Sequence, residues 1–385
     1  MPIVGINSLL LALDETYRSA GVANYNAQLL RHLPAAAPDL HLRAFVGDRR
    51  FSAAPGMAVA RPAWSTRRPL ARIAWEQSAL ALASRRLDLL HGAVYASPLL
   101  ASCPTVITVH DLTFVHHAAA LKRFHRVYLR LITRLSAQRA VRVIAASENT
   151  RRELIDWLAL PPARVIAVPN GVSEEFAPAT PVAVEAFRRQ HGLPARFILF
   201  VGTLEPRKNV ERLLTAFAQA RSHLDADTYL VIAGSKGWYY QQIFAQAAAL
   251  GRGDRPSRVI FPGFVPAAQL PWWYRAATVF VYPSLYEGFG LPVLEAMASG
   301  TAVITSNTSS LPEVTGDAAI LIDPTDVDAL AAALVRLLND ADLRAHLSAA
   351  GVRQAAQFSW RRCAEETVAV YREALGLPPG MERSP

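Results

Sequence analysis

Short apolar runs alternate with longer amphipathic stretches along the first half of the chain. The runs predicted to be extended are residues 2–12, 41–47, 105–109 and 141–145, and the first helix is predicted over residues 22–33. Runs of this length, rich in β-branched residues and separated by helices, are typical of a parallel sheet covered on both faces. The pattern therefore predicts a doubly wound α/β domain.

The second half repeats this alternation after the turn sequence Pro169-Asn170-Gly171. Strands are predicted at residues 197–201, 229–233, 259–261, 278–282 and 302–305, with helices at 210–220, around 292–298, after Asp326 and after Trp360. We predict two Rossmann-like domains, residues 1–172 and 173–359, facing across a cleft. A C-terminal helix at about 360–378 should pack back on the first domain. Ligands of such sheets bind at the carboxyl ends of the strands.

The composition suits two apolar cores. Of 385 residues, 52% are hydrophobic and 18% charged, which is enough for two domains of roughly 150–200 residues each. The net charge is +9, and residues 1–180 hold 21 Lys and Arg against 12 Asp and Glu. We expect the first half to face an anionic partner or surface. No nucleic-acid reader motif accompanies the charge, so nucleic acid is not an expected partner.

The expected compartment follows from what the sequence lacks. Residues 1–13 are apolar without a basic leader, and no uninterrupted apolar run approaches about 18 residues. Cys103 and Cys363 stand alone, as expected in a reducing compartment. We expect a cytoplasmic protein, with a peripheral position at the inner face of the membrane left open.

Two adjacent cations, Arg207 and Lys208, precede the helix predicted at residues 210–220. Arg offers a bidentate fork, Lys a point charge and the helix end free N–H groups, which together suit a diphosphate. The alternative is a solvated turn with Asn209 as a helix cap. Because the loop follows a central strand, we favour the diphosphate site.

The loop after the next-to-last predicted strand carries two carboxylates and two glycines. Glu287 lies beside Gly288 and Gly290, and Glu295 is predicted to lie in the first turn of the helix that Pro292 opens. The glycines let backbone N–H groups approach a ligand, and a carboxylate here can accept two hydroxyls of a sugar or ribose. The alternative is that Glu295 only complements the positive end of its helix.

Glu287 and Glu295 enclose seven residues, and this pair resembles the two-glutamate motif of retaining GT-B glycosyltransferases of the large nucleotide-sugar family, family four. Further similarity, over essentially the whole chain, lies in Arg18-Ser-Ala-Gly21-Val22-Ala-Asn-Tyr25, His110-Asp111, Val168-Pro-Asn-Gly171-Val172, Thr203-Leu-Glu-Pro-Arg207-Lys208-Asn209, Gly263-Phe264-Val265 and Ser309-Ser-Leu-Pro-Glu313-Val314. The segment 203–209 is similar to that of mannosyltransferases that use GDP-mannose, although users of UDP-glucose look similar.

The resemblance implies a role for each matching residue. Arg207 and Lys208 would hold the donor diphosphate, Glu295 the ribose hydroxyls and Glu287 the transferred sugar. Backbone groups would complete the donor site: Gly288, Phe289, Gly290 and Leu291 around the sugar, Gly263 and Val265 beside the base, and Gly21 against the phosphate.

His110 ends the predicted strand at residues 105–109 and is expected to point into the cleft. There it would position a hydroxyl of the transferred sugar and stabilise positive charge at the anomeric carbon. A histidine after a strand is by itself more often structural, but the resemblance and the neighbouring Asp111 favour a catalytic role. Asp111 either orients the histidine ring or caps a turn. His110, Asp111 and Glu287 are thus the candidate catalytic residues.

No uncommitted carboxylate is expected at the reacting carbon. A retaining glycosidase needs two carboxylates about 5 Å apart, whereas Glu287 and Glu295 are assigned to hydroxyls. The resemblance implies front-side displacement, in which the leaving diphosphate takes the acceptor's proton and Arg207 and Lys208 stabilise that leaving group. Three Asp-x-Asp matches, at residues 225–227, 326–328 and 340–342, are better explained by capping and solvation. No metal and no further cofactor are therefore expected.

A basic segment from Leu121 to Arg142 holds seven Lys and Arg and no acid. Two helical faces are predicted in it, one with Arg123, Arg126, Arg130 and Arg134, the other with Phe124, Tyr128, Leu131 and Leu135. Two interpretations stay open. The helix either leans on anionic lipid or a lipid-linked diphosphate acceptor, or it is a solvated helix whose apolar side packs inward.

The sequence thus predicts a metal-independent, retaining hexosyltransferase for cell-surface polysaccharide synthesis. The preferred reaction moves mannose from GDP-mannose to a glycan or lipid-linked acceptor. A UDP-sugar-dependent glucosyltransferase, and a nucleotide-sugar epimerase or hydrolase of the same fold, are the alternatives. A catalytically inactive binding protein is least expected, because all four charged residues of the motif loops are present.

Overall fold

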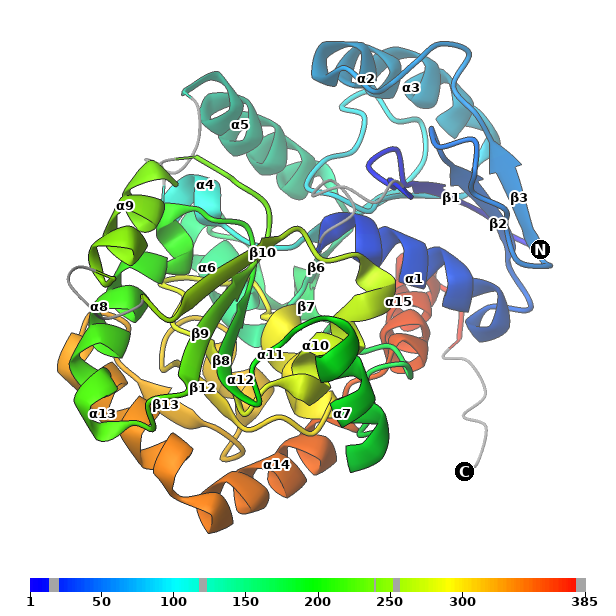
Figure 1. Cartoon of the computed structure of the whole chain (residues 1–385). Coiled ribbons are helices and arrows are strands. Elements are labelled where there is room, and N and C mark those ends of the chain that lie inside the picture. The colour runs from blue at the N-terminus through cyan, green and yellow to red at the C-terminus, as the bar shows by residue number, and fades with distance from the viewer. Residues whose placement is uncertain (14–20, 118–122, 239, 252–256, 379–385) are drawn as a thin grey trace. The chain divides into compact units, whose positions relative to one another are not determined.

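The computed structural model describes residues 1–13, 21–117, 123–238, 240–251 and 257–378. The chain folds into two compact units (Figure 1). Unit 1 comprises Met1–Gly171 and the C-terminal segment that begins at Ser359, and unit 2 comprises Val172–Phe358. Each unit contains a parallel sheet with helices on its faces, so the predicted fold class is confirmed.

In the described part of unit 1, seven parallel strands lie in the order β3-β2-β1-β4-β5-β6-β7. Their bounds are β1 Ile3–Asn7, β2 His41–Phe45, β3 Met57–Ala60, β4 Leu89–Gly92, β5 Thr105–Val109, β6 Arg142–Ala145 and β7 Val165–Ala167. The central strand β5 is buried along its whole length, as expected for a parallel strand covered on both faces. The strand order reverses between β1 and β4, which is a topological switch point.

Helices cover both faces of this sheet. They are α1 Val22–Ala36, α2 Pro69–Trp75, the π-helix η2 Glu76–Leu80, α3 Ala81–Ala83, α4 Thr113–His116, α5 Arg123–Arg139, α6 Glu148–Leu158 and α15 Trp360–Ala374. The C-terminal helix α15 packs against α1. A buried hydrogen bond of 2.6 Å between Tyr371 of α15 and His91 of β4 ties it to the sheet.

In the described part of unit 2, six parallel strands lie in the order β10-β9-β8-β11-β12-β13. They are β8 Arg196–Val201, β9 Thr228–Ala233, β10 Val259–Gly263, β11 Val279–Tyr282, β12 Val303–Ser306 and β13 Ile320–Ile322. The helices are α7 Pro181–Gln190, α8 Val210–Ala220, α9 Gln241–Ala249, α10 Leu270–Ala276, α11 Leu291–Ala298, α12 Leu311–Thr315, α13 Val327–Asn339 and α14 Ala341–Ala355, with the 3-10 turn η6 at Pro206–Lys208. Here the switch point lies between β8 and β11.

The chain crosses between the units twice, at residues 171–172 and 358–359. Within unit 2, the Val172 N–H donates to the Phe358 carbonyl at 3.2 Å. Within unit 1, a Cβ on Gly171 would lie 2.1 Å from the backbone nitrogen of Trp360, so glycine is required for this close approach. The two crossing segments therefore run side by side.

The predicted extended segment at residues 2–12 is too long. β1 ends at Asn7, because the chain turns there and the Leu11 N–H donates to the Ser8 carbonyl at 3.0 Å. The short strands β3, β4 and β13 and the helix α14 are absent from the prediction. They lack the length or the clear periodicity on which it rests.

Candidate functional site

Arg207 and Lys208 lie in η6, between β8 and α8. Asn209 follows with a left-handed backbone, φ 61°, a conformation that asparagine tolerates better than most residues. Its side-chain amide donates to the carbonyls of Pro283 and Pro324 at 2.9 and 2.6 Å, and it makes no side-chain cap on α8. Asn209 therefore stands at the N-cap position of α8, but its side chain anchors the neighbouring loops and does not cap the helix. Lys208 and Asn209 are buried, so the alternative of a solvated turn is wrong.

The loops after β8 and β11 are joined at the switch point of unit 2. The Leu285 N–H donates to the Arg207 carbonyl at 2.9 Å. From the loop after β12, the Ser310 hydroxyl donates to the carbonyls of Glu287 and Phe289 at 3.0 and 2.8 Å. These bonds hold the predicted motif residues at the carboxyl edge of one sheet.

Gly290 ends this loop and precedes α11. Its φ is 109°, a backbone conformation that favours glycine, and a Cβ there would also lie 2.7 Å from the Leu311 side chain. In α11, which begins at Leu291, Pro292 has no N–H group and the Val293 N–H donates to the Gly290 carbonyl at 3.0 Å. The Leu291 N–H is therefore the backbone donor of the first turn that is left for a ligand beside the Glu287 loop.

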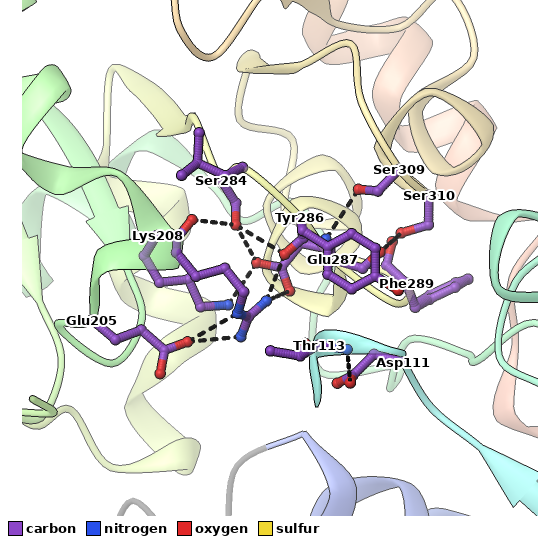
Figure 2. Close-up of polar contacts among 12 residues, drawn as sticks. Asp111, Thr113, Glu205, Lys208, Ser284, Tyr286, Glu287, Phe289, Ser309 and Ser310 are labelled. Carbon is purple, nitrogen blue, oxygen red and sulfur yellow. Dashed lines mark hydrogen bonds and ion pairs between the residues drawn. The ribbon is translucent and has the colours of Figure 1, made fainter. Parts of the chain in front are cut away.

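Two cations and two carboxylates meet between these loops (Figure 2). Lys208 Nζ lies 2.6 Å from Glu287 Oε1, and Arg207 Nη1 lies 2.9 Å from Glu287 Oε2. Arg207 Nη2 lies 2.8 Å from Glu205 Oε1. The four side chains are only 8–14% exposed, so these are buried ion pairs.

Glu287 has further donors around it. Ser284 Oγ donates to Oε1 at 2.6 Å and Tyr282 Oη donates at 3.0 Å. With Lys208 and Arg207, four side chains thus contact this one carboxylate. Its role toward a transferred sugar stays a prediction; the structure shows it as the counter-ion of both cations.

The pKa values in the cluster follow from burial and from these pairs. Burial alone would raise the pKa of Glu287, but Arg207 and Lys208 together outweigh it and hold that pKa at about 2. Burial and the charge of Arg207 lower the pKa of Lys208, while Glu287 opposes this shift. Because Glu287 is ionised throughout the neutral range, we take the cluster as a charged network.

Glu295 is positioned differently from the prediction. It lies in the second turn of α11, and the first turn contains no acidic residue, so the alternative role at the helix end is wrong. Its Oε2 accepts a 3.0 Å hydrogen bond from Tyr274 Oη. Burial raises the pKa of Glu295 to about 7, with Tyr274 opposing and Glu175 adding to the shift.

Comparison with known proteins gives the family. The model of glycosyl transferases group 1 matches residues 184–354, and that of glycosyltransferase family 4 matches residues 19–176. O-antigen chain mannosyltransferase B of Escherichia coli is 34% identical over 268 residues, which cover 69% of this chain and 70% of that protein. The chain belongs to glycosyltransferase family 4.

Other relatives agree with this assignment. Serotype-specific mannosyltransferase WbdA of Escherichia coli is 33% identical over 241 residues, covering 62% of this chain and 29% of WbdA. Sucrose-phosphate synthase of Thermosynechococcus elongatus has a TM-score of 0.78 at 24% identity, with 98% and 100% of the two chains covered. Anabaena HepE, solved with UDP and glucose, has a TM-score of 0.74 at 17% identity over 97% and 100%. These solved structures confirm the GT-B fold.

The residues that the family resemblance assigns to the base lie at the end of β10. Gly263 has φ 81°, and its carbonyl accepts a 2.8 Å hydrogen bond from the Gly234 N–H. Val265, two residues on, is buried. The carboxyl ends of β9 and β10 are thereby joined, and contact with a base stays a prediction.

In unit 1 of this family 4 glycosyltransferase, His110 follows β5 and is buried. Its Nε2–H donates to the Ala93 carbonyl at 3.0 Å, and burial lowers the pKa of its ring. Asp111 Oδ1 accepts from the Thr113 N–H at 2.9 Å (Figure 2), which caps the turn into α4. Of the two roles kept open for Asp111, the structure shows the turn cap, and the Ala93 carbonyl holds the ring.

Gly21 immediately precedes α1 with φ 33°, and a Cβ there would have nothing within 4 Å. The backbone therefore requires a residue without a side chain, while the space beside it is open. The preceding motif residues Arg18, Ser19 and Ala20 lie outside the described residues.

The basic segment contains α5, and several apolar side chains of this helix are exposed to solvent. Phe124, Val127 and Leu131 are 67%, 56% and 57% exposed. Ile132 and Ala137 contribute to the buried side instead. The alternative that the predicted apolar side packs inward is therefore wrong for Phe124 and Leu131.

One aspartate of each Asp-x-Asp match has a structural role. Asp326 and Asp340 accept the N–H groups of Ala329 and Leu343 at the starts of α13 and α14. Asp225 pairs with Arg196. Over the described residues, no cluster of three or more His, Cys, Asp or Glu could hold a metal ion. In the same part of the chain, no helix is long and apolar enough to cross a membrane.

Several residues of the site were missed by the sequence analysis. They are Glu205, Tyr274, Tyr282 and Ser284. Glu205 and Ser284 lie inside the loops that were singled out, so a search for every polar residue in those loops would have found them. Tyr274 lies in a helix and Tyr282 in a strand, and the sequence pattern of both elements is typical of the apolar core. Nothing in the sequence distinguishes these two tyrosines from aromatic residues that only pack there.

Proposed function

We propose that this glycosyltransferase moves a hexose from a nucleoside-diphosphate sugar to a glycan or lipid-linked acceptor, with retention and without a metal ion. The observation that carries the proposal is the buried contact of Lys208 and Arg207 with Glu287 at the β8–β11 switch point. Such a site offers cations and helix N–H groups to a diphosphate. GDP-mannose is the preferred donor, because relatives that are 33–34% identical to this chain are mannosyltransferases.

The proposed mechanism assigns the electrostatic work to Lys208. Negative charge builds up on the leaving diphosphate as the glycosidic bond breaks, and a pre-positioned buried cation stabilises it without reorganisation. Arg207 forms ion pairs with Glu205 and Glu287. We therefore infer that it contributes to the positive electrostatic potential of the loop without contacting the diphosphate directly. Glu295 would accept the ribose hydroxyls. The leaving diphosphate would take the acceptor's proton, as in front-side displacement.

Calorimetric titration with GDP, UDP, ADP and dTDP, each with EDTA present, tests this function. Binding of GDP alone, followed by turnover of GDP-mannose, is the expected result. Preference for UDP would instead favour the UDP-sugar glucosyltransferase, a possibility kept by the fold shared with HepE. Release of free sugar without transfer would favour a hydrolase, and binding of none of the four nucleotides would contradict the donor site.

Donor affinity should depend on pH through Glu295. Its pKa is about 7, and the ribose hydroxyls need the ionised carboxylate as acceptor. Above pH 7 the group is ionised; below it a proton must be released on binding, so affinity should fall by up to about tenfold per pH unit. A nucleotide sugar, whose diphosphate does not titrate in this range, should bind more tightly at pH 8 than at pH 6. Glu295→Gln should flatten the profile, and an unchanged profile in this variant would remove Glu295 from the donor site.

We also propose that α5 leans on an anionic membrane surface. Exposed apolar side chains beside arginines suit the interface of an anionic bilayer, at about 1 kcal/mol for each cation. Replacing Arg126, Arg130 and Arg134 by alanine should reduce sedimentation with phosphatidylglycerol vesicles by more than tenfold, and added salt should weaken what remains. The control removes three exposed cations elsewhere in unit 1, Arg31, Arg49 and Arg361. Equal loss in both variants would mean that net charge, and not α5, sets the binding.

A further inference from the structure

Tyr282 ends β11 and brings a phenolic hydroxyl from the apolar core to the charged cluster of unit 2. The tyrosine is 0% exposed, and its ring stacks on those of Phe200 and Phe280, with centroids 5.7 and 5.9 Å apart. This packing requires no hydroxyl, because a phenylalanine ring would stack in the same way. The role of the hydroxyl must therefore lie in its hydrogen bonds.

Within the described residues, the Tyr282 hydroxyl bonds to both members of one ion pair. It accepts a hydrogen bond of 2.5 Å from Lys208 Nζ and donates one of 3.0 Å to Glu287 Oε1. Lys208 Nζ itself donates to Glu287 Oε1 at 2.6 Å, and these two side chains point toward each other in Figure 2. The three groups thus form a closed triangle of hydrogen bonds.

This triangle restrains the ammonium of Lys208 from two directions. An ammonium has three N–H donors, and Tyr282 and Glu287 take two of them in the described part of the chain. The third N–H is left for a phosphate oxygen. A lysine side chain is otherwise flexible, with three donors that rotate freely. The hydroxyl therefore helps to confine this long side chain to one position.

The hydroxyl also affects the charge of Lys208. Burial and the positive charge of Arg207 lower the pKa of Lys208, and Glu287 and Glu205 oppose this shift. Burial and the charge of Glu287 raise the pKa of Tyr282 well above its ordinary value of 10, so the phenol stays neutral. A neutral hydroxyl that accepts from an ammonium stabilises the charged form. Loss of this hydroxyl should therefore lower the pKa of Lys208 further.

We propose that Tyr282 is a positioning residue for glycosyl transfer, whose hydroxyl keeps the Lys208 ammonium in place and charged for the leaving diphosphate. A cation that is already fixed stabilises the developing charge without reorganisation during the reaction. Tyr282 acts through Lys208 and does not itself contact the donor. This role rests on the proposed function, because only the departure of a diphosphate requires a fixed cation at this place.

Tyr282→Phe in the full chain, assayed with the donor found by calorimetry, tests this role. The ring is kept, so kcat should fall by roughly tenfold or more while KM for the donor stays within about threefold. The alkaline limb of the kcat profile should move to lower pH, because the ammonium loses an acceptor. Tyr229→Phe is the matched control. Tyr229 lies near the start of β9, at the opposite edge of the sheet, so its loss of a hydroxyl should leave both kinetic parameters within about twofold.

A double-mutant cycle distinguishes action through Lys208 from a general effect on the fold. In the Lys208→Met background, Tyr282→Phe should change kcat by less than about twofold, because the group that the hydroxyl holds is already absent. A full further loss in that background would overturn the proposal. So would an unchanged kcat and pH profile in Tyr282→Phe alone, or a rise in KM at unchanged kcat.

A second variant decides the question if Tyr282→Phe fails to fold. Replacement of Tyr282 by 3-fluorotyrosine keeps the ring and the hydroxyl but makes the oxygen a poorer acceptor. It should lower kcat by about threefold, and an unchanged kcat would overturn the proposal.

Calorimetry and Lys208→Met distinguish failure of this role from failure of the proposed function. If the wild type binds a nucleotide and Lys208→Met loses turnover while Tyr282→Phe does not, only the positioning role is wrong. If no nucleotide binds, or if Lys208→Met turns over at the wild-type rate, the proposed function fails and the positioning role fails with it.

Discussion

Replacing Lys208 by methionine should lower kcat/KM for glycosyl transfer by roughly 10²–10³-fold, or about 3–4 kcal/mol of transition-state stabilisation. Lys208 is the buried cation whose ammonium contacts Glu287 and Tyr282, and methionine keeps most of its volume without the charge. Glu287 retains Arg207 as a partner in this variant, so the fold should survive. Steady-state rates with the donor found by calorimetry provide the measurement.

The control for this variant removes an exposed cation from the same unit. Arg353 lies on α14 and is exposed, so Arg353→Ala should leave kcat/KM within about twofold of the wild type. Turnover of the Lys208 variant at the wild-type rate would contradict the assignment of the leaving group to this loop. An equal loss of kcat/KM in both variants would mean that the net charge of unit 2, and not the position of Lys208, stabilises the leaving group.

Replacing Glu287 by glutamine should destabilise unit 2 by about 3–5 kcal/mol, because removal of one partner leaves buried cations unpaired. The pKa of about 2 gives a similar magnitude, about 3 kcal/mol relative to an ordinary glutamate. Since this pKa is depressed, the stabilisation is present above about pH 4.5 and is lost as the pH falls toward 2. Urea unfolding followed by fluorescence at pH 7 and at pH 3.5 measures both effects.

Glu185→Gln is the matched control for that experiment. Glu185 is a half-exposed carboxylate of unit 2 that pairs with Arg188 and Arg189 at 3.7 Å, and its loss should change stability by less than about 1 kcal/mol. The wild type should lose more stability than Glu287→Gln between pH 7 and pH 3.5. Parallel losses in both proteins would mean that Glu287 is not the titrating group.

Sequence patterns located most of the scaffold and the loops that carry the candidate donor site. The strand β5 and the helix α8 begin and end where their periodicity predicts, because each is a single uninterrupted apolar pattern. The chemistry inside the loops was less accessible. Tyr282 and Lys208 are 74 residues apart in the chain, and no local pattern reports a contact over that separation. Glu295 was predicted in the first turn of its helix and lies in the second, because the helix begins at Leu291, one residue before Pro292.

The side chains of α5 show a second limit of prediction from hydrophobic periodicity. Periodicity identified two faces of this helix, but it does not say which face packs on the protein. The exposed Phe124 and Leu131 became visible only when the neighbouring elements were in place. The buried contact between Asn7 and Glu76 was missed for the same reason: 69 residues separate the two side chains, and neither stands in a recognisable motif.

The double crossing of the chain determines how this enzyme can be recombined with its relatives. Unit 1 contains α15, which comes from the opposite end of the chain and shares a buried hydrogen bond with β4. A chimaera joined only near residue 171 would combine one enzyme's N-terminal sheet with another enzyme's closing helix, and the contacts of Tyr371 and Trp360 would be mismatched. Exchange of unit 1 between such enzymes therefore requires two junctions, near residues 171 and 359, so that α15 is transferred together with the sheet that it covers.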